Sequence, residues 1–322
     1  MPDRSHSFRQ RPLASLALAL LLPLAALAGC ASGDDAEDDG RLNVVATTSI
    51  VADAVRAVGG DAVRVTPLMG PNVDPHLYRP SEGDVGRMAS ADVVVVNGLD
   101  LEGKMGEALE QLAARGTRVA AIAEAVPDSS RRASVQFEGA FDPHVWMDPS
   151  LWRLVTGRAA EVLAEADPEN AEAYAARAAA YADSLAALDA ELRQRLAAVP
   201  ESRRVLVTAH DAFEYFGRAY GFEVRGLQGL STATEAGTAD VQDLARFVAD
   251  RGIPAMFVET SVSERSIRAV QEAVRARGGE VALGRPLYSD ALGDAASGAD
   301  TVIGMLRSNA EAIVEGLAPA DA

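Results

Sequence analysis

The sequence predicts an α/β protein built of two similar halves on either side of one long helix. In both halves, short runs rich in β-branched residues alternate with helical patterns, as in βαβ units with parallel strands. Several of these runs are apolar almost without interruption, which is typical of strands buried on both faces. The segment between the halves, residues 150–199, is rich in Ala, Leu, Glu and Arg and contains no strand-like run.

The first half contains the clearest strand, in which four consecutive valines lie between Ala91 and Asn97. Strands and helices alternate around it, which indicates a parallel sheet. The pair Gly59-Gly60 closes the first helical pattern. We expect strands at residues 42–48, 62–69, 91–97 and 118–122, and helices at 50–58 and 103–114.

The second half follows the same plan, although its sequence does not repeat that of the first. Each apolar run is again followed by a helical pattern, so a second parallel α/β unit is expected. The strands are predicted at residues 204–208, 222–225, 255–259 and 280–283, and the helices at 211–219, 238–251, 264–277 and 298–317.

The run Asp167-Pro168-Glu169-Asn170 interrupts the central segment, and a long helix is predicted from Pro168 onward, with Asp167 as its N-cap. From Pro168 to Ala198 there is no Gly and no further Pro, which leaves room for roughly 45 Å of helix at the standard rise. Its apolar residues recur at spacings that place one stripe against a core. The residues alone leave two interpretations open: a long helix inside one domain, or a rigid connector between two α/β lobes with a cleft where the lobes meet. The stripe consists of Tyr174, Tyr181, Leu185, Leu188, Leu192 and Leu196.

Residues 1–29 have the order of a secretory signal peptide, with basic residues, a short apolar run and then small residues. The run is too short for a comfortable transmembrane helix. It ends in Leu27-Ala28-Gly29-Cys30, which resembles the bacterial lipobox, where the cysteine receives a lipid after cleavage. The alternative is a plain signal peptide with an incidental cysteine. Residues 30–41, acidic and small, predict a flexible lipoprotein tether.

The composition excludes several classes of function. A net charge of −17 over 322 residues argues against a nucleic-acid partner, because such proteins present a basic face. Cys30 is the only cysteine, which excludes a disulfide framework and a cysteine-based zinc site. No apolar stretch long enough to span a membrane follows the leader.

Three histidines remain after the leader, and each falls in or beside a loop of the predicted α/β units. His76 follows a strand, His144 precedes a helix, and His210 lies at the carboxyl end of a strand, the edge where α/β sheets bind ligands. His76 and His144 both stand in the tripeptide Asp-Pro-His. Imidazole is a preferred ligand for zinc, and a tetrahedral site without a thiol would take a carboxylate as its fourth ligand.

Four motifs together resemble the zinc/manganese family of solute-binding lipoproteins of ABC transporters (cluster A-I, family 9). The resemblance runs in order from Val44 to about Leu317. The motifs are Asp-Pro-His-x-Tyr-x-Pro from Asp74, Asp-Pro-His-x-Trp-x-Asp-Pro from Asp142, Thr-Ala-His-x-Ala-Phe-x-Tyr from Thr208, and Leu-Tyr-Ser-Asp-Ala-Leu-Gly from Leu287.

The resemblance implies two Rossmann-like lobes with parallel sheets, a long rigid linking helix and one metal site in the cleft between the lobes. Matched motif by motif, His76, His144, His210 and Asp290 are the implied metal ligands. The expected division is a signal peptide at 1–29, a tether at 30–41, an N-terminal lobe at 42–167, a linking helix at 168–199 and a C-terminal lobe at 200–322.

The third ligand bears on the choice of metal. Manganese-type members resemble a set of two histidines and two carboxylates, whereas the third motif here contains His210. Three imidazoles and one carboxylate favour Zn²⁺, so Zn²⁺ is the expected cargo and Mn²⁺ should bind more weakly. A manganese-specific or adhesin-type member of the family is the alternative.

Three carboxylates are candidates to orient the ligand histidines from outside the coordination sphere: Glu259, Asp142 and Asp74. The stretch Gly98–Met105 nearly matches a nucleotide-binding loop, but Met105 replaces the Ser or Thr that would hold Mg²⁺, and two acids would face the phosphates.

The expected function is that of a non-catalytic extracytoplasmic receptor that captures Zn²⁺ for an ABC importer. A secreted zinc hydrolase is the less favoured reading, because there is no His-Glu-x-x-His helix and a fourth protein ligand leaves no place for a reactive water. The expected partners are the permease and its ATPase, the protein is expected to be a monomer, and its lipid at Cys30 places it on the outer face of the cytoplasmic membrane or in the periplasm.

Overall fold

The computed structural model describes residues 40–134 and 139–319. The predicted signal peptide, Cys30 and nearly all of the acidic tether lie outside these ranges. In the part of the chain that is described, no helix is both long and apolar enough to cross a membrane.

The N-terminal lobe is built around a parallel four-stranded sheet in the order β2-β1-β3-β4. The strands are β1 (Leu42–Ala46), β2 (Val63–Pro67), β3 (Val93–Val96) and β4 (Val119–Ala121). The four valines of β3 are all buried, as a central strand covered on both faces requires. The sheet confirms the parallel arrangement expected from the sequence, with each strand shorter than the apolar run that predicted it.

Three helices belong to this lobe: α1 (Ser49–Gly59), α2 (Glu82–Ala89) and α3 (Gly106–Ala114). The expected helix at 103–114 starts with a 3₁₀ turn at Gly103–Met105. Helix α2 was not expected. Its start is fixed by a capping box, in which Ser81 Oγ accepts from the Asp84 amide while the Asp84 side chain accepts from the Ser81 amide.

The C-terminal lobe contains two parallel pairs of strands, β5 with β6 and β7 with β8. The Phe257 amide donates to the Val207 carbonyl (2.8 Å), which places the end of β7 beside β5. The bounds of these strands are β5 (Val205–His210), β6 (Glu223–Gln228), β7 (Ala255–Met256) and β8 (Ala282–Leu283). The helices are α6 (Glu214–Tyr220), α7 (Thr238–Arg251), α8 (Arg265–Ala276) and α9 (Val302–Leu317).

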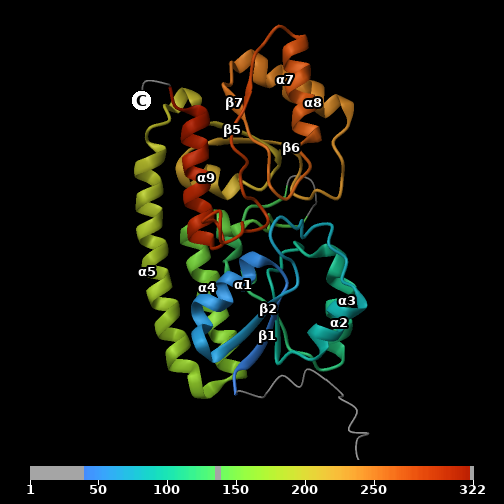
Figure 1. The fold of residues 1–322 in the computed structure, drawn as a ribbon, viewed down its shortest axis with the longest axis vertical. Coiled ribbons are helices and arrows are strands. Elements are labelled where there is room, and N and C mark those ends of the chain that lie inside the picture. The colour runs from blue at the N-terminus through green and yellow to red at the C-terminus, as the bar shows by residue number, and fades with distance from the viewer. Residues whose placement is uncertain (1–39, 135–138, 320–322) are drawn as a thin grey trace, which may run out of the picture. The chain divides into compact units, whose positions relative to one another are not determined.

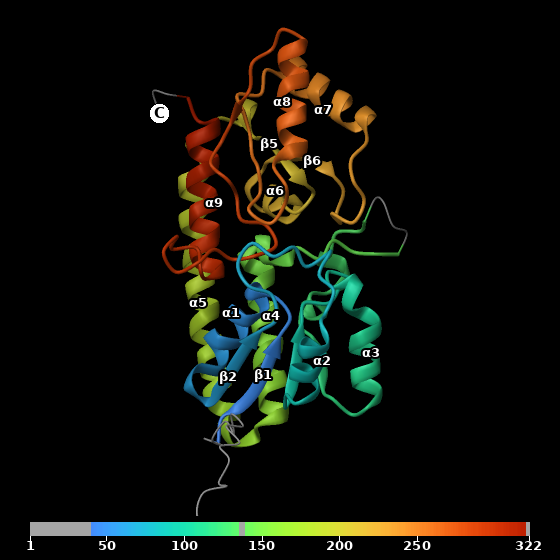
Figure 2. The ribbon, with the colours of Figure 1, turned by 45° about the vertical axis from the view of Figure 1, so that its right-hand side comes forward.

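The central segment forms two helices, α4 (Pro149–Ala166) and α5 (Ala171–Leu196), separated by a 3₁₀ turn at Pro168–Asn170. Helix α5 buries one stripe and exposes the opposite side, as its apolar spacing predicted. It packs against α4, α1 and α9, and Figures 1 and 2 show it beside α4 and α9 along its length. The C-terminal helix α9 also reaches the N-terminal lobe, where the Val302 amide donates to Asp53 Oδ2 on α1 (2.9 Å).

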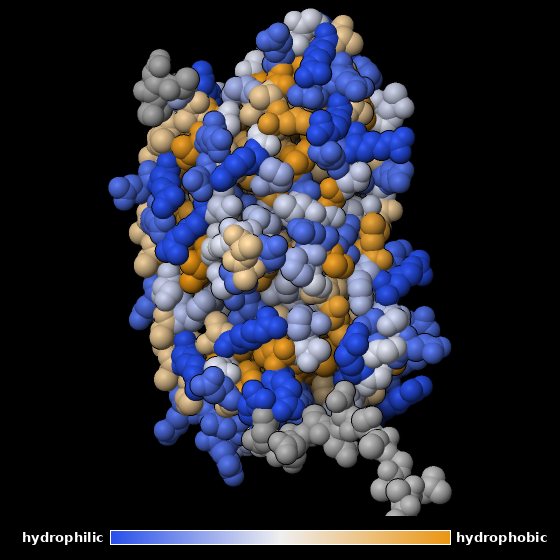
Figure 3. Space-filling view, viewed as in Figure 1, coloured by the Kyte–Doolittle hydropathy of each residue, from blue (hydrophilic) through white to orange (hydrophobic). Residues whose placement is uncertain are grey.

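The largest core cluster draws on both lobes and on α5, so apolar packing joins the two lobes through the helices between them. Hydrophilic side chains are spread over the face seen in Figure 3, and apolar side chains lie between them in small groups. Among the described residues, the only large hydrophobic side chains that are exposed are Leu77 and Leu154.

Candidate metal centre

Of the four residues expected to bind metal, three lie at or after the carboxyl end of a strand, and His144 lies just before a helix. His76 lies in the loop after β2, and His144 precedes the 3₁₀ turn Val145–Met147 that leads into α4. His210 is the last residue of β5, and Asp290 lies in the loop after β8. Because parallel strands end at a common edge of the sheet, two loops from each lobe meet over one point.

These four side chains converge on one buried site. One ligand atom from each lies within 4.8 Å of all the others, and all four residues are buried. His210 Nε2 is 3.1 Å from Asp290 Oδ2, His144 Nε2 is 3.4 Å from Asp290 Oδ1, and His76 Nε2 is 3.4 Å from His144 Nε2. Ligand atoms about 2.0–2.1 Å from a tetrahedral zinc ion stand about 3.3 Å apart, which is close to these three distances. The distance from His76 Nε2 to Asp290 Oδ2 is longer, 3.8 Å.

The site leaves polar atoms without partners. Both carboxylate oxygens of Asp290 and Nε2 of His210 are buried and contact one another or His144 and His76, but among the described residues none of the three makes a hydrogen bond of good geometry. A buried polar atom without a partner is costly, so these atoms call for a group that the protein itself does not supply. A divalent cation fits, because imidazole nitrogens and a carboxylate oxygen are its natural donors.

Burial and nearby carboxylates shift the pKa values of the three histidines in opposite directions. Burial lowers the pKa of His144, but the carboxylates of Asp142 and Asp290 outweigh it and raise that pKa to about 9. Burial also opposes the charge on His210, yet Asp290 and Glu259 hold its pKa well above the usual range. At His76 burial dominates and lowers the pKa to about 3. An arriving cation must therefore displace protons from His144 and His210, whereas His76 is already neutral.

Asp142 holds the ring of His144. Its Oδ1 lies 2.7 Å from His144 Nδ1 and also accepts a hydrogen bond from the His144 amide (2.9 Å). With Nδ1 bonded in this way, Nε2 is directed at the centre of the site. The structure thus places Asp142 where the sequence suggested it.

Glu259 plays the corresponding part at His210, from a different strand. Its Oε2 lies 2.6 Å from His210 Nδ1, and its Oε1 accepts a hydrogen bond from the His210 amide (2.9 Å). Glu259 follows β7 and is buried. The carboxylate fixes both the backbone and the ring of its histidine.

Asp74 behaves differently. Its Oδ1 accepts a hydrogen bond from the His76 amide (2.8 Å) but lies beyond ion-pair distance of the His76 ring. Its Oδ2 accepts from the hydroxyl of Thr232, a residue of the C-terminal lobe (2.6 Å). Sequence reasoning singled out Asp74 but not Thr232, which stands in no motif.

Trp146 connects the two sides of the site. Its ring packs edge-on against His144 with centroids 5.2 Å apart, and its Nε1 donates to the Ser289 carbonyl (2.9 Å), next to Asp290. On the other side of Asp290, the Leu292 amide donates to Ser49 Oγ on α1 (3.0 Å). Two groups of the N-terminal lobe therefore hold the C-terminal loop that carries Asp290.

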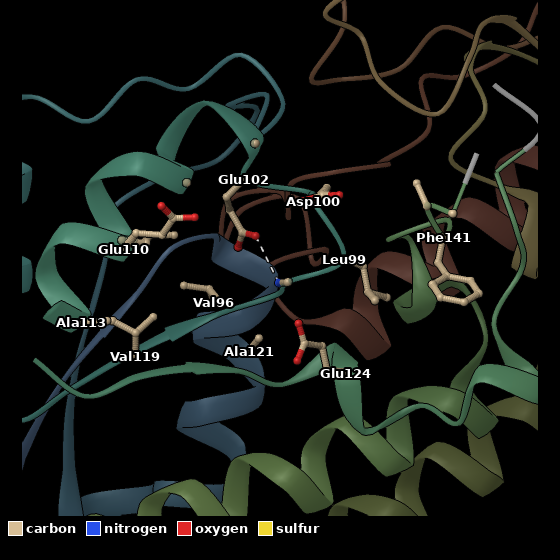
Figure 4. Close-up of a pocket in the computed structure, with 16 residues that line it drawn as sticks. Val96, Leu99, Asp100, Glu102, Glu110, Ala113, Val119, Ala121, Glu124 and Phe141 are labelled. Atoms are coloured by element: carbon tan, nitrogen blue, oxygen red, sulfur yellow. Dashed lines mark hydrogen bonds between the residues drawn. The ribbon is translucent and has the colours of Figure 1, made fainter. Parts of the chain in front are cut away.

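In the loop after β3 that resembles a nucleotide-binding loop, the side chain of Glu102 occupies the backbone amides. Glu102 accepts hydrogen bonds from the amides of Asn97 (2.7 Å) and Gly98 (3.2 Å) and from Thr47 Oγ1 (2.6 Å). Figure 4 shows this carboxylate at the loop, beside a pocket of about 540 Å³ that Glu110 and Glu124 also line. The backbone groups that would cradle a phosphate are occupied, and the pocket walls repel anions.

Comparisons with known proteins place the chain among metal carriers. A family model described as "Zinc-uptake complex component A periplasmic" matches residues 44–316. The zinc-binding protein TroA of Treponema pallidum is 46% identical over 285 residues, which cover 88% of this chain and 91% of the relative. The manganese-binding lipoprotein MntA of Bacillus subtilis is 44% identical over 303 residues, which cover 94% and 98%. The solved structure of the periplasmic zinc binding protein TroA from Treponema pallidum matches with a TM-score of 0.83 over 87% of this chain and 100% of that chain.

Proposed function

The chain belongs to the family of periplasmic components of zinc-uptake complexes, and we propose that it captures Zn²⁺ outside the cytoplasm and delivers it to the permease of an ABC importer. One observation carries the proposal most directly: three imidazoles and one carboxylate converge in a buried site where the carboxylate oxygens have no other partner among the described residues. We assign His76, His144, His210 and Asp290 as the ligands.

The choice of Zn²⁺ over Mn²⁺ is the finer part of this proposal. The two relatives named above are called zinc-binding and manganese-binding at nearly equal identity, so similarity does not separate the metals. The ligand chemistry supports Zn²⁺, because imidazole suits zinc whereas manganese prefers oxygen donors. Asp290 is the only carboxylate within 4.8 Å of all three ring nitrogens in the described cluster.

We infer that the protein is a receptor and not a hydrolase. A catalytic zinc site keeps one position open for water, whereas Asp290 lies close enough to the three imidazoles to serve as a fourth protein ligand, which supports a closed site. Its partners are then the permease and, through it, the ATPase of the importer, with the receptor acting as a monomer. The division into lobes at residues 42–167 and 200–322 with a linking helix at 168–199 belongs to the same proposal.

The test of metal choice is a competition titration. Metal-free protein is titrated with Zn²⁺ against a chelator, and then with Mn²⁺ against bound Zn²⁺. We expect one Zn²⁺ per chain and displacement by Mn²⁺ only at large excess. His210→Glu, which replaces an imidazole with a carboxylate, should weaken Zn²⁺ more than Mn²⁺. Preference of the wild-type chain for Mn²⁺ would support the manganese-specific alternative instead.

We further propose that Cys30 carries a lipid that anchors the protein to the outer face of the cytoplasmic membrane. Support comes from the sequence Leu27-Ala28-Gly29-Cys30 and from relatives named as lipoproteins. Cys30→Ala should release the protein from membrane fractions and leave its Zn²⁺ affinity unchanged, because the tether separates the anchor from the site. A variant that stays membrane-bound would contradict the lipid assignment.

A further inference from the structure

The His76 loop is held in place differently from the other ligand-bearing segments. The rings of His144 and His210 each have a carboxylate within 2.7 Å of Nδ1. Among the described residues, the only carboxylate within ion-pair distance of the His76 ring is the ligand Asp290 itself, on the Nε2 side. The position of His76 therefore depends on what holds its backbone.

The backbone of His76 is held through Asp74. Asp74 Oδ1 accepts from the His76 amide, and Asp74 Oδ2 accepts from Thr232 Oγ1 at 2.6 Å. Thr232 follows β6 in the C-terminal lobe, so this chain of two hydrogen bonds crosses from one lobe to the other. The two hydrogen bonds link the backbone amide of His76 in one lobe to the side-chain hydroxyl of Thr232 in the other.

Thr232 is placed for this contact. It is 6% exposed, whereas Ala233, Thr234 and Glu235, which follow it, are exposed. The loop is tied at its base, where Gln228 Nε2 donates to the Thr234 carbonyl (3.0 Å). Because the loop is anchored, the Thr232 hydroxyl is held against the Asp74 carboxylate. In a freely moving loop, water would compete for the same hydrogen bond.

We propose that Thr232 is a positioning residue that fastens the His76 loop across the lobes and thereby sets the rate at which the bound metal leaves. This inference rests on the proposed function. When the Thr232–Asp74 hydrogen bond breaks, the His76 loop is free to withdraw with its ligand, while His144 and His210 stay held by carboxylates of their own. His76 is then the ligand through which the site opens.

The experiment measures the rate of Zn²⁺ release from the loaded protein after mixing with excess chelator. Thr232→Val keeps the β-branched shape and removes the hydroxyl. We expect release to be about five- to tenfold faster, the effect of one buried hydrogen bond. Thr232→Ser restores the hydroxyl and should release Zn²⁺ within about twofold of wild type. The matched control is Thr156→Val on α4, whose hydroxyl donates to the Arg153 carbonyl (3.1 Å) in a buried position away from the ligands.

A second arm separates positioning from general destabilisation. In an Asp74→Ala background, Thr232→Val should add no further acceleration, because its partner is already absent. Equal acceleration with and without Asp74, or equal acceleration in Thr156→Val, would overturn the inference. If wild-type protein bound no Zn²⁺, the proposed function itself would fail. If the wild type binds one Zn²⁺ and Thr232→Val releases it at the wild-type rate, only the proposed role of Thr232 is contradicted.

Discussion

The tripeptide Asp-Pro-His occurs twice, at residues 74–76 after β2 and at residues 142–144 before α4. In both copies the aspartate accepts a hydrogen bond from the amide of the histidine two residues later. In the second copy the same oxygen also holds the histidine ring, whereas in the first the carboxylate reaches across to the other lobe. The same three residues thus hold the ring of one proposed ligand directly and connect the other proposed ligand to a loop of the other lobe.

The surroundings explain the difference. The second copy is enclosed: Asn97 Nδ2 donates to the Pro143 carbonyl (3.2 Å) and the Tyr215 hydroxyl donates to the Asp142 carbonyl (3.1 Å). The first copy lies next to Leu77, which is half exposed, and its flank is tied by the Tyr78 hydroxyl to Asp84 (2.9 Å). A motif specifies local geometry, and the packing around it decides whether that geometry is rigid or can open.

The largest effects should come from the two histidines themselves. His144→Ala removes the imidazole that pairs with Asp142 and one of the three imidazoles near Asp290. His76→Ala removes the imidazole that has no carboxylate at its Nδ1. Each substitution should weaken Zn²⁺ binding by more than about 100-fold. That is the upper limit of the loss expected when a residue that only orients a ligand is removed. Chelator competition measures this. A variant of either residue that binds Zn²⁺ like wild type would remove that histidine from the ligand set.

Substitution of the two aspartates, Asp142 and Asp74, should affect different properties of Zn²⁺ binding. Asp142→Ala should lower the equilibrium affinity for Zn²⁺ by about 10- to 100-fold, because the His144 ring loses its orientation. Asp74→Ala should act mainly on the release rate and have the smaller effect on affinity. Isothermal or chelator titration of both variants tests the contrast, and an Asp74→Ala loss equal to that of Asp142→Ala would erase it.

The pH dependence sharpens the same comparison. With the pKa of His144 raised to about 9, this imidazole is protonated at pH 7 in the metal-free chain, and Zn²⁺ must displace that proton. Zinc affinity should therefore rise between pH 7 and pH 9, whereas His76, with its pKa lowered to about 3, adds nothing in that window.

The stability of the metal-free fold should change with pH in the opposite direction from the Zn²⁺ affinity. Because the folded-state pKa of His144 lies above its unfolded value, its contribution to the free energy of unfolding is complete below about pH 6.5 and is lost as pH rises through about 9. Asp142→Ala should reduce the pH dependence of both quantities, measured by chelator titration and by denaturant unfolding at several pH values. An unchanged slope in Asp142→Ala would show that this carboxylate does not hold the proton on His144.

The smallest effect is expected at Tyr215. Its hydroxyl donates to the Asp142 carbonyl and accepts from the Arg132 amide (3.0 Å), so it supports the second copy only through backbone. Tyr215→Phe should cost about 1 kcal/mol of unfolding free energy and change Zn²⁺ affinity by less than about tenfold. Thermal unfolding and a single titration check this, and a loss of Zn²⁺ binding would mean that Tyr215 acts on the ligands more directly.

The sequence alone predicted those site residues whose type or motif points to metal binding. Three histidines are conspicuous because the sequence contains so few. Asp142 shares the tripeptide of His144, and Glu259 lies at the end of a predicted strand. Asp290 entered only through the resemblance, because a lone aspartate in a loop looks like any other. Thr232 gave no signal at all, since its role depends on a contact between segments 158 residues apart.

The fold shows the same limit. Runs of buried apolar residues predicted the strands, but strand β7 ends at Met256 within the run at 255–259. Beyond it the pairing is irregular: the Phe257 amide donates to Val207, and Glu259 forms an isolated parallel bridge with Leu287. Helix α2 escaped prediction because its eight residues include two glycines and bury only Asp84 and Met88. Its one sequence signal was the capping pair Ser81 and Asp84.

The most direct test of the account is zinc K-edge X-ray absorption on the protein loaded with one Zn²⁺, recorded for wild type, His76→Ala and His144→Ala. We expect a first shell of three imidazole nitrogens and one carboxylate oxygen at about 2.0–2.1 Å in wild type. Each variant should lose one imidazole from that shell. A wild-type shell with fewer than three imidazoles, or variants with an unchanged shell, would contradict the assignment of His76, His144, His210 and Asp290 as the metal ligands.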